Sequence, residues 1–186
     1  MLAAMALRPD LRLTYEDYAE LPDDGRRHEL VDGELFEMSA PSVRHQDIVG
    51  KIYRRLADHL DRHDDGRVFL SPCDVLLSDF DVVQPDVIFV ARADAGIVTE
   101  PNLKGTPTLL IEVLSDARHD RVRKRDLYAR FGVGEYWIVD PHADRVEVYR
   151  LAGTTYEKPV IMEPGEKLST AVIPELSLDV ADILCQ

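Results

Sequence analysis

Residues 106–115 read TPTLLIEVLS, and this stretch decides the fold class. It is too short for a helix, is rich in Leu, Ile and Val, and is apolar on both faces, which indicates a strand at the centre of a covered sheet. Glu112 interrupts the apolar run. Burying a carboxylate is costly unless it is paired or binds a metal. Glu112 is therefore either a metal ligand or one half of a buried ion pair with an arginine.

The segments on either side of this strand predict a mixed α/β fold. Before it, the residue patterns predict a helix at 14–21, a hairpin at 28–38, a helix at 45–63, and strands at 67–77 and 82–91. After it, they predict a basic amphipathic helix at 120–131, hairpin strands at 135–140 and 145–151, a β pair at 156–162 and a short segment at 177–184. No repeat or linker divides the chain, so we expect one domain over residues 1–186.

The composition, the cysteine content and the apolar runs indicate where in the cell the protein is found. Hydrophobic residues make up 45% and charged residues 31% of the 186 residues, which is typical of a globular domain. Cys73 and Cys185 are too far apart and too few for a disulfide framework or a cysteine-ligated zinc site. The apolar start is shorter than a signal peptide core, and no later apolar run could span a bilayer. We therefore expect a soluble cytoplasmic protein with no membrane contact.

The charge distribution bears on nucleic acid as a partner. The net charge of −13 opposes binding to phosphates, which relies on Lys and Arg. However, residues 118–130 contain six basic and two acidic residues, a local charge of +4 that leaves −17 on the remainder. This basic strip either contacts phosphates or is a solvated helix face.

Two further residues stand out beside Glu112. Asp86 opens an apolar strand after a proline, so it is either a turn residue or a carboxylate ligand. On the basic helix, Lys124 shares a face with Leu127 and Tyr128, which define the buried side. A lysine that points toward the sheet is either half of a structural salt bridge or a catalytic cation.

Together, Asp86, Glu112 and Lys124 have the chemistry of a phosphodiester hydrolase. Two carboxylates from adjacent strands can hold Mg²⁺ or Mn²⁺, hard cations that prefer oxygen ligands. The metal and a nearby ammonium can activate a water and stabilise the charge that develops on the phosphate. Without a cation, two close carboxylates would repel each other and one would be protonated.

Several segments resemble the putative restriction endonuclease family that is abundant in cyanobacteria, within the PD-(D/E)xK nuclease superfamily. They are HELVDGEL (28–35), QPDVIFV (84–90), IEVLS (111–115), the set Asp120, Lys124 and Tyr128, and FGVGEYWIVDP (131–141). The similarity covers about residues 14–151, the expected core. It implies a restriction-endonuclease-like fold: a central mixed sheet flanked by helices, here with an extra N-terminal hairpin and C-terminal strands.

The resemblance also implies roles for particular residues. Asp86, after Pro85, and Glu112 are the acidic metal ligands. The standard motif has a lysine two residues after the glutamate, where this chain has Leu114, so the lysine is moved to Lys124 on the following helix. A long side chain can bring an ammonium to the same place from another element.

Other residues are candidates for supporting roles. Glu29 and His45 match family positions and are either accessory ligands or structural groups, the structural reading being favoured for His45. Asp120 is a further accessory candidate. Phosphate contacts are expected from Arg118, Arg121, Arg123 and Arg125.

The sequence thus predicts a Mg²⁺-dependent endonuclease that acts on DNA as a homodimer, since cutting both strands of a duplex suits two-fold symmetry. The alternatives are an inactive nucleic-acid- or protein-binding module on the same fold, and an enzyme that cleaves RNA. A Ser-His-Asp hydrolase is disfavoured because the chain has no Gly-x-Ser-x-Gly motif. A Gly-rich phosphate loop is also absent, so we expect no nucleotide cofactor.

Overall fold

The structure is a computed structural model that describes residues 12–115 and 119–185, although not the side chains of residues 119 and 120. The strands form a seven-stranded sheet, a five-stranded sheet and a two-stranded ladder. The helices are α1 (Tyr15–Ala19), α2 (Val43–Leu60), α3 (Arg125–Arg130) and α4 (Val180–Leu184), with a 3₁₀ helix η1 (Arg92–Ile97) and a π-helix η2 (His119–Lys124).

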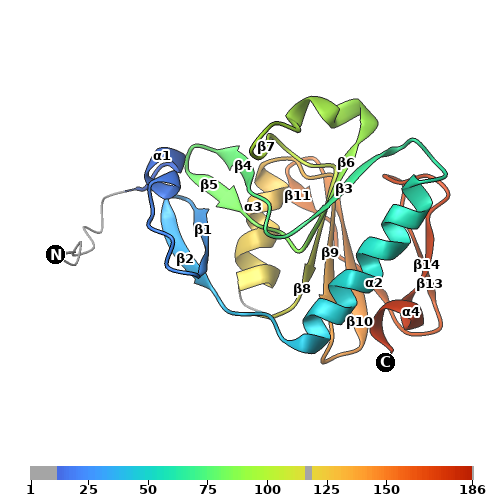
Figure 1. The fold of residues 1–186 in the computed structure, drawn as a ribbon. Coiled ribbons are helices and arrows are strands. Elements are labelled where there is room, and N and C mark those ends of the chain that lie inside the picture. Colours follow the sequence, from blue (N-terminus) through green and yellow to red (C-terminus); the bar gives the residue numbers. More distant parts are fainter. Residues whose placement is uncertain (1–11, 116–118, 186) are drawn as a thin grey trace.

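The seven-stranded sheet is the centre of the molecule (Figure 1). Its strand order is β11-β10-β9-β8-β6-β3, and β12 also pairs with β10. The strands are β3 (Gly66–Leu70), β6 (Val87–Ala91), β8 (Leu109–Val113), β9 (Glu135–Asp140), β10 (Arg145–Ala152), β11 (Thr155–Tyr156) and β12 (Val160–Met162). Among the described strands of this sheet only β8 and β9 pair in parallel, because the chain crosses over between them through η2 and α3.

Helices cover both faces of this sheet. Ile48 and Ile52 of α2 belong to one buried cluster with Ile111 of β8. Leu127 of α3 belongs to the other, with Leu110 of β8. Consecutive β8 residues thus point to opposite layers, as expected for a strand that is buried on both faces. The mixed sheet flanked by helices confirms the predicted α/β class and the restriction-endonuclease-like arrangement.

The five-stranded sheet carries the N-terminal hairpin. Its order is β2-β1-β5-β4-β7, formed by β1 (Arg27–Val31), β2 (Glu34–Met38), β4 (Val75–Ser78), β5 (Asp81–Val83) and β7 (Leu103–Lys104). The predicted turn is confirmed: Asp32 and Gly33 have φ of 53° and 79° between the paired Val31 and Glu34. Two central residues with positive φ make the tight turn that matches the twist of a hairpin.

Two of the predicted strands are each split in two. The apolar run 67–77 becomes β3 and β4, and the run 82–91 becomes β5 and β6. In both cases the first and second parts lie in different sheets. The breaks fall at Pro72 and Pro85, which have no N–H to donate to a strand ladder. The chain therefore passes between the two sheets at the QPD segment that carries Asp86.

Two other predictions need correction. The helix predicted at 120–131 starts as the π-helix η2, and α3 covers only its second half. The predicted β pair at 156–162 is formed differently, because β11 and β12 each pair with β10 and not with each other. Strand β10 is long enough, at eight residues, to offer each of them a separate segment.

The C-terminal segment packs beside α2 (Figure 1). Strands β13 (Lys167–Ser169) and β14 (Ser177–Asp179) form the two-stranded ladder and lead into α4. Leu168, Leu178 and Ile183 belong to the same buried cluster as the α2 face of the main sheet. Within the described residues, no helix combines the length and apolar character needed to cross a membrane.

Candidate active site

Asp86 and Glu112 meet at one end of the main sheet. Strands β6 and β8 are antiparallel neighbours, with Val87 opposite Ile111. Continuing this register by one residue sets Asp86 opposite Glu112, and their exposed fractions are 6% and 4%. Like charges directly opposite each other destabilise a sheet. The pair therefore calls for a compensating cation.

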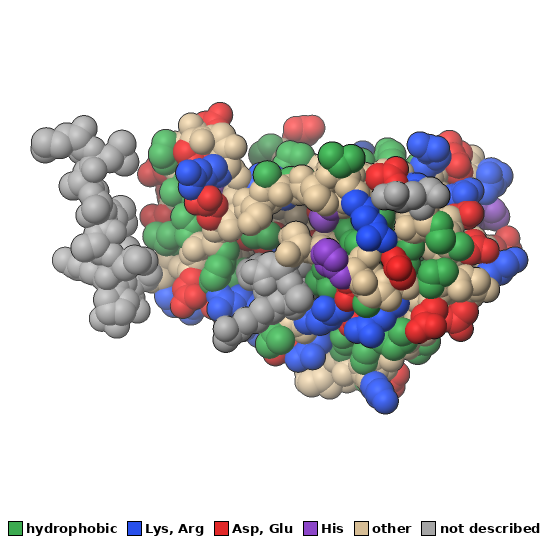
Figure 2. Space-filling model, turned by 90° about the horizontal axis from the view of Figure 1, so that it is seen from below, with side chains coloured by type: hydrophobic (Ala, Val, Ile, Leu, Met, Phe, Trp, Pro, Cys, Tyr) green, Lys and Arg blue, Asp and Glu red, His purple; other side chains and the backbone are tan. Residues whose placement is uncertain are grey.

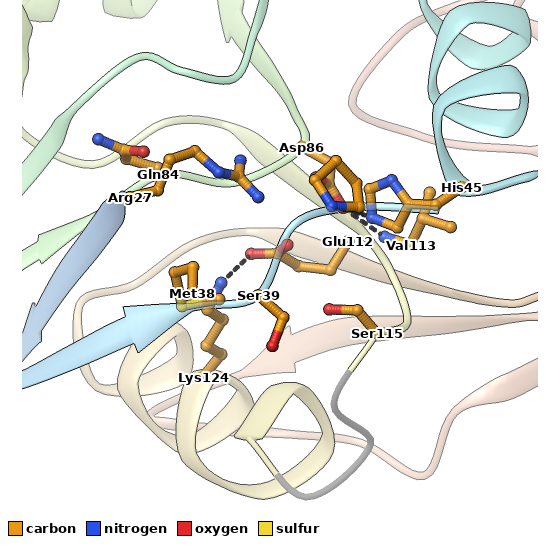
Figure 3. A pocket seen from close by; sticks show the side chains of 11 residues that line it. Arg27, Met38, Ser39, His45, Gln84, Asp86, Glu112, Val113, Ser115 and Lys124 are labelled. Carbon is orange, nitrogen blue, oxygen red and sulfur yellow. Dashed lines mark hydrogen bonds and ion pairs between the residues drawn. The ribbon is translucent and has the colours of Figure 1, made fainter. Parts of the chain in front are cut away.

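Lys124 of η2 supplies one compensating charge (Figure 3). Its Nζ atom lies 2.8 Å from Oε1 of Glu112 and 2.9 Å from Oε1 of Glu29. Lys124 is 1% exposed and Glu29 is fully buried. The predicted orientation of Lys124 toward the sheet is confirmed, and Glu29 of β1 joins it from the five-stranded sheet.

Tyr128 is a second donor to Glu112, beside Lys124. It lies one turn after Lys124, and its hydroxyl donates to Oε1 of Glu112 at 3.0 Å. Burial, reinforced by the carboxylates of Glu112 and Glu29, raises the pKa of Tyr128 well above its ordinary value. The phenol therefore stays protonated and keeps donating to Glu112.

His45 holds Asp86 from the first turn of α2. Its Nε2 atom lies 3.1 Å from Oδ2 of Asp86, and the backbone N–H of Val113 donates to the same oxygen at 2.8 Å. The side chains of His45 and Asp86 are 6% and 9% exposed. The helix begins here because Ser42 caps it and accepts a hydrogen bond from the His45 backbone N–H.

A small pocket contains four of these side chains in its lining, His45, Asp86, Glu112 and Lys124 (Figure 3). Its lining residues come from both sheets, from α2 and from η2: Arg27, Met38, Ser39, Pro41, His45, Gln84, Asp86, Glu112, Val113, Ser115 and Lys124. Figure 3 shows the Lys124 side chain rising from its helix to the Glu112 carboxylate, while His45 approaches Asp86. The predicted residues Asp86, Glu112 and Lys124 thus share one pocket.

The donor set of the pocket fits a hard divalent cation. Asp86 and Glu112 offer carboxylate oxygens, and Mg²⁺ is commonly bound by one or two carboxylates while it keeps several waters. Two buried polar atoms of the lining, Oε1 of Gln84 and Nδ1 of His45, have no hydrogen-bond partner among the described residues. Such atoms can bond to the water shell of an ion.

The arginines of the basic strip at residues 118–130 that the structure describes mostly contact side chains of the protein itself. Arg123 lies 3.5 Å from Glu34 and packs over the Phe36 ring, and Arg125 donates to Asp126 at 2.8 Å. Among the described side chains on the face seen in Figure 2, basic and acidic groups alternate without a continuous basic surface. The predicted phosphate contacts of Arg123 and Arg125 stay predictions, and Arg118 lies outside the described residues.

Arg121 ties η2 to the β9–β10 hairpin. Its Nη2 atom lies 2.6 Å from Oδ2 of Asp140 and 2.8 Å from Oε1 of Glu147. Although partial burial acts to raise the pKa of Glu147, hydrogen bonds from Arg121 and Tyr149 lower it overall. Phosphate binding by Arg121 would require breaking these ion pairs. The pairs fix the start of the element that carries Lys124.

Glu147→Gln is expected to lower the free energy of unfolding by about 1.5–3 kcal/mol near neutral pH, because it weakens charged hydrogen bonds of a buried group. The folded-state pKa of Glu147 lies below its ordinary value of 4.5. The ionised group therefore stabilises the fold fully above pH 4.5, and this contribution is lost as the pH falls through the folded-state pKa.

Urea unfolding of wild type and Glu147→Gln at about pH 7 and about pH 3.5 measures this difference. The gap between the two proteins should shrink at the acidic pH. Glu157→Gln, at an exposed position outside the cluster, is the matched control. An equal gap at both pH values would contradict the assignment.

Two residues of the site have no role assigned to them from the sequence. Tyr128 belongs to the family resemblance and lies on the Lys124 face, but its bond to Glu112 was not predicted, and its four-residue spacing from Lys124 is the available signal. Gln84 donates its backbone N–H to Oε1 of Glu29 at 2.8 Å, and its side chain lines the pocket. The signal in the sequence for this role of Gln84 is its position two residues before Asp86. The side chain of Asp120, an accessory candidate, lies outside the described part.

Comparisons with known proteins agree with this geometry. No curated protein matches the chain. The crystal structure of "a putative nuclease belonging to DUF820" from Anabaena variabilis ATCC 29413 superposes with a TM-score of 0.78. It is 18% identical, and the alignment covers 92% of this chain and 97% of that one. The likeness extends over almost the whole fold.

A family model adds the sequence relationship. The Uma2 model, described as "Putative restriction endonuclease", matches residues 15–181. This range includes both sheets, the pocket and most of the C-terminal segment. The chain therefore belongs to the Uma2 family, in agreement with the resemblance found in its sequence.

Proposed function

We propose that this protein is a metal-dependent endonuclease that hydrolyses phosphodiester bonds of DNA at the pocket of Asp86, Glu112 and Lys124. The observation that carries the proposal is a single pocket lined by the buried carboxylates of Asp86 and Glu112 and by Lys124, whose ammonium lies 2.8 Å from Glu112. Family membership supports a nuclease. The oxygen donor set supports Mg²⁺ or Mn²⁺ as the ion.

Each residue has a distinct role in this proposal. Asp86 and Glu112 would hold the ion, which lowers the pKa of a bound water and neutralises charge on the phosphate. Lys124 would orient the attacking water or bind a phosphate oxygen through its ammonium. Glu29 holds Lys124 at 2.9 Å.

The remaining groups position the ligands. His45 and the Val113 N–H both bond to Oδ2 of Asp86, which directs its second oxygen away from them. Tyr128 fixes Oε1 of Glu112. Because these hydrogen bonds hold the two carboxylates in place, the carboxylates need to reorganise less during the reaction.

Duplex DNA is the proposed substrate, with a homodimer presenting two pockets to the two strands. Arg123 and Arg125, whose side chains are 45% and 37% exposed, are the proposed phosphate contacts among the described residues. Both would exchange a carboxylate partner for a phosphate oxygen. Cleavage should accordingly weaken as salt rises.

The test is cleavage of supercoiled plasmid by wild type with Mg²⁺ or Mn²⁺, beside Asp86→Asn. Wild type should nick the plasmid only when metal is present, and Asp86→Asn should leave it intact because one ligand charge is lost. Asp182→Asn, an exposed aspartate on α4, is the matched control and should cleave like wild type.

Other outcomes would redirect the proposal. Equal nicking by wild type and Asp86→Asn would mean that the activity comes from a contaminant or another site. If metal binds but the plasmid stays intact while RNA is cut, the substrate is RNA. If neither metal binding nor cleavage is found, the inactive binding module is the correct reading.

A further inference from the structure

A second cluster of metal-ligating side chains lies at the far end of α2 from the pocket. His59 and His63 are four residues apart, and Asp65 precedes β3. Their ligand atoms lie within 4.8 Å of one another, and no other such group of three occurs among the described side chains of residues 12–115 and 121–185. We propose that His59, His63 and Asp65 bind a transition-metal ion of the zinc class.

The ligand types set the class of ion. Two imidazoles and one carboxylate suit Zn²⁺ and related first-row ions, whereas Mg²⁺ prefers oxygen ligands alone. Histidines four residues apart at a helix end lie on the same side. Three protein ligands leave a coordination position for water. The cluster therefore differs in chemistry from the carboxylate pocket.

The three side chains already approach one another closely. Nε2 of His59 lies 3.4 Å from Oδ2 of Asp65. The rings of His59 and His63 stack with centroids 4.3 Å apart. The His59 side chain is 7% exposed, while those of His63 and Asp65 are about one-third exposed. His59 is the buried member of the cluster, and the accessible His63 and Asp65 let an ion reach it from solvent.

The surroundings favour a cation. Residues 58–65 contain four aspartates and one arginine. The C-terminal end of α2 adds the negative end of its dipole. Oε2 of Glu175 lies 4.0 Å from Nδ1 of His63, from the loop before β14 that runs beside this end of α2 (Figure 1). This further carboxylate adds to the negative potential around the histidines.

The cluster is independent of the nuclease pocket. His45 is at the first turn of α2 and His59 at its last, which separates them by roughly 21 Å along the helix axis. An ion at this end would link α2 to the start of β3. It would therefore stabilise the fold without contacting Asp86 or Glu112, and this inference does not depend on the proposed nuclease activity.

The experiment is isothermal titration of the untagged full chain with Zn²⁺, using Asp86→Asn so that the pocket contributes less to binding. One ion per chain should bind with a dissociation constant in the micromolar range or tighter, and the melting temperature should rise. His63→Ala should weaken binding at least about tenfold, since even groups that only support a ligand contribute that much. Asp65→Asn should also weaken it.

His142→Ala is the matched control, because His142 is exposed and outside the cluster. It should bind Zn²⁺ as the parent does. Circular dichroism without metal checks that His63→Ala, at a partly exposed position, is folded. Millimolar binding in the parent, or equal binding by folded His63→Ala and the parent, would overturn the proposal and leave His59 and Asp65 as a plain ion pair.

Discussion

Replacing Glu112 with glutamine is expected to lower the cleavage rate by roughly a thousandfold, because a metal ligand that stabilises charge contributes several kcal/mol to the transition state. Glutamine has nearly the same shape, and its amide oxygen can still accept from Lys124 and Tyr128, which both bond to Oε1 of Glu112. The fold should therefore survive. The loss would reflect the missing negative charge at the ion.

Single-turnover cleavage of labelled duplex DNA at saturating Mg²⁺ measures this rate. Glu163→Gln, an exposed glutamate in the C-terminal part of the chain, is the matched control. Calorimetry should show weaker Mg²⁺ binding by Glu112→Gln. If the variant cleaves within about tenfold of wild type, Glu112 is no ligand and its role is limited to pairing with Lys124.

Lys124→Met is expected to lower the free energy of unfolding by about 3–5 kcal/mol, because removing one partner leaves uncompensated charge in the interior. Glu29 and Glu112 both bond to Lys124 Nζ, and both are buried. Without the ammonium, the two carboxylates face an apolar side chain. One of them must then take up a proton, which adds to the cost at neutral pH.

A double-mutant cycle with Glu29→Gln measures the coupling. Glu29→Gln in the Lys124→Met background should restore part of the lost stability, because it removes one of the two carboxylate charges that the Lys124 ammonium no longer balances. Urea unfolding of all four proteins gives the free energies. Lys158→Met, at an exposed lysine, should be nearly neutral. Additive effects of the two substitutions would contradict a shared buried network.

The sequence predicts the site wherever its signal is local. Glu112 stands out as a charge inside an apolar run, and Lys124 as a lysine on the face that Leu127 defines. Both predicted orientations depend only on the period of one strand or one helix. The structure accordingly has both side chains buried.

The parts that were missed depend on contacts between distant segments. Glu29 and Lys124 are 95 positions apart, and their pairing requires the five-stranded sheet to dock beside α3. That Asp86 and Glu112 come from adjacent strands was expected from their chemistry, but the register between β6 and β8 was not predicted. Apolar patterns show that a strand is buried but not which strand it joins.

The split strands show the same limit. The run 82–91 is apolar except at Gln84 and Asp86, and such a pattern is equally satisfied by one long strand or by two strands in different layers. Pro85 was the available signal for the break. The prediction treated it as part of the metal-binding motif, although it also marks the change of sheet.

The enclosure of Lys124 affects chemical modification of the protein. Acylating reagents and lysine acetyltransferases attack a neutral amine that they can reach, and this amine is 1% exposed and ion-paired with two carboxylates. In the native state, we expect acylation to modify the surface lysines and to leave Lys124 unmodified. The rate at which Lys124 becomes labelled therefore reports how often the two sheets separate locally.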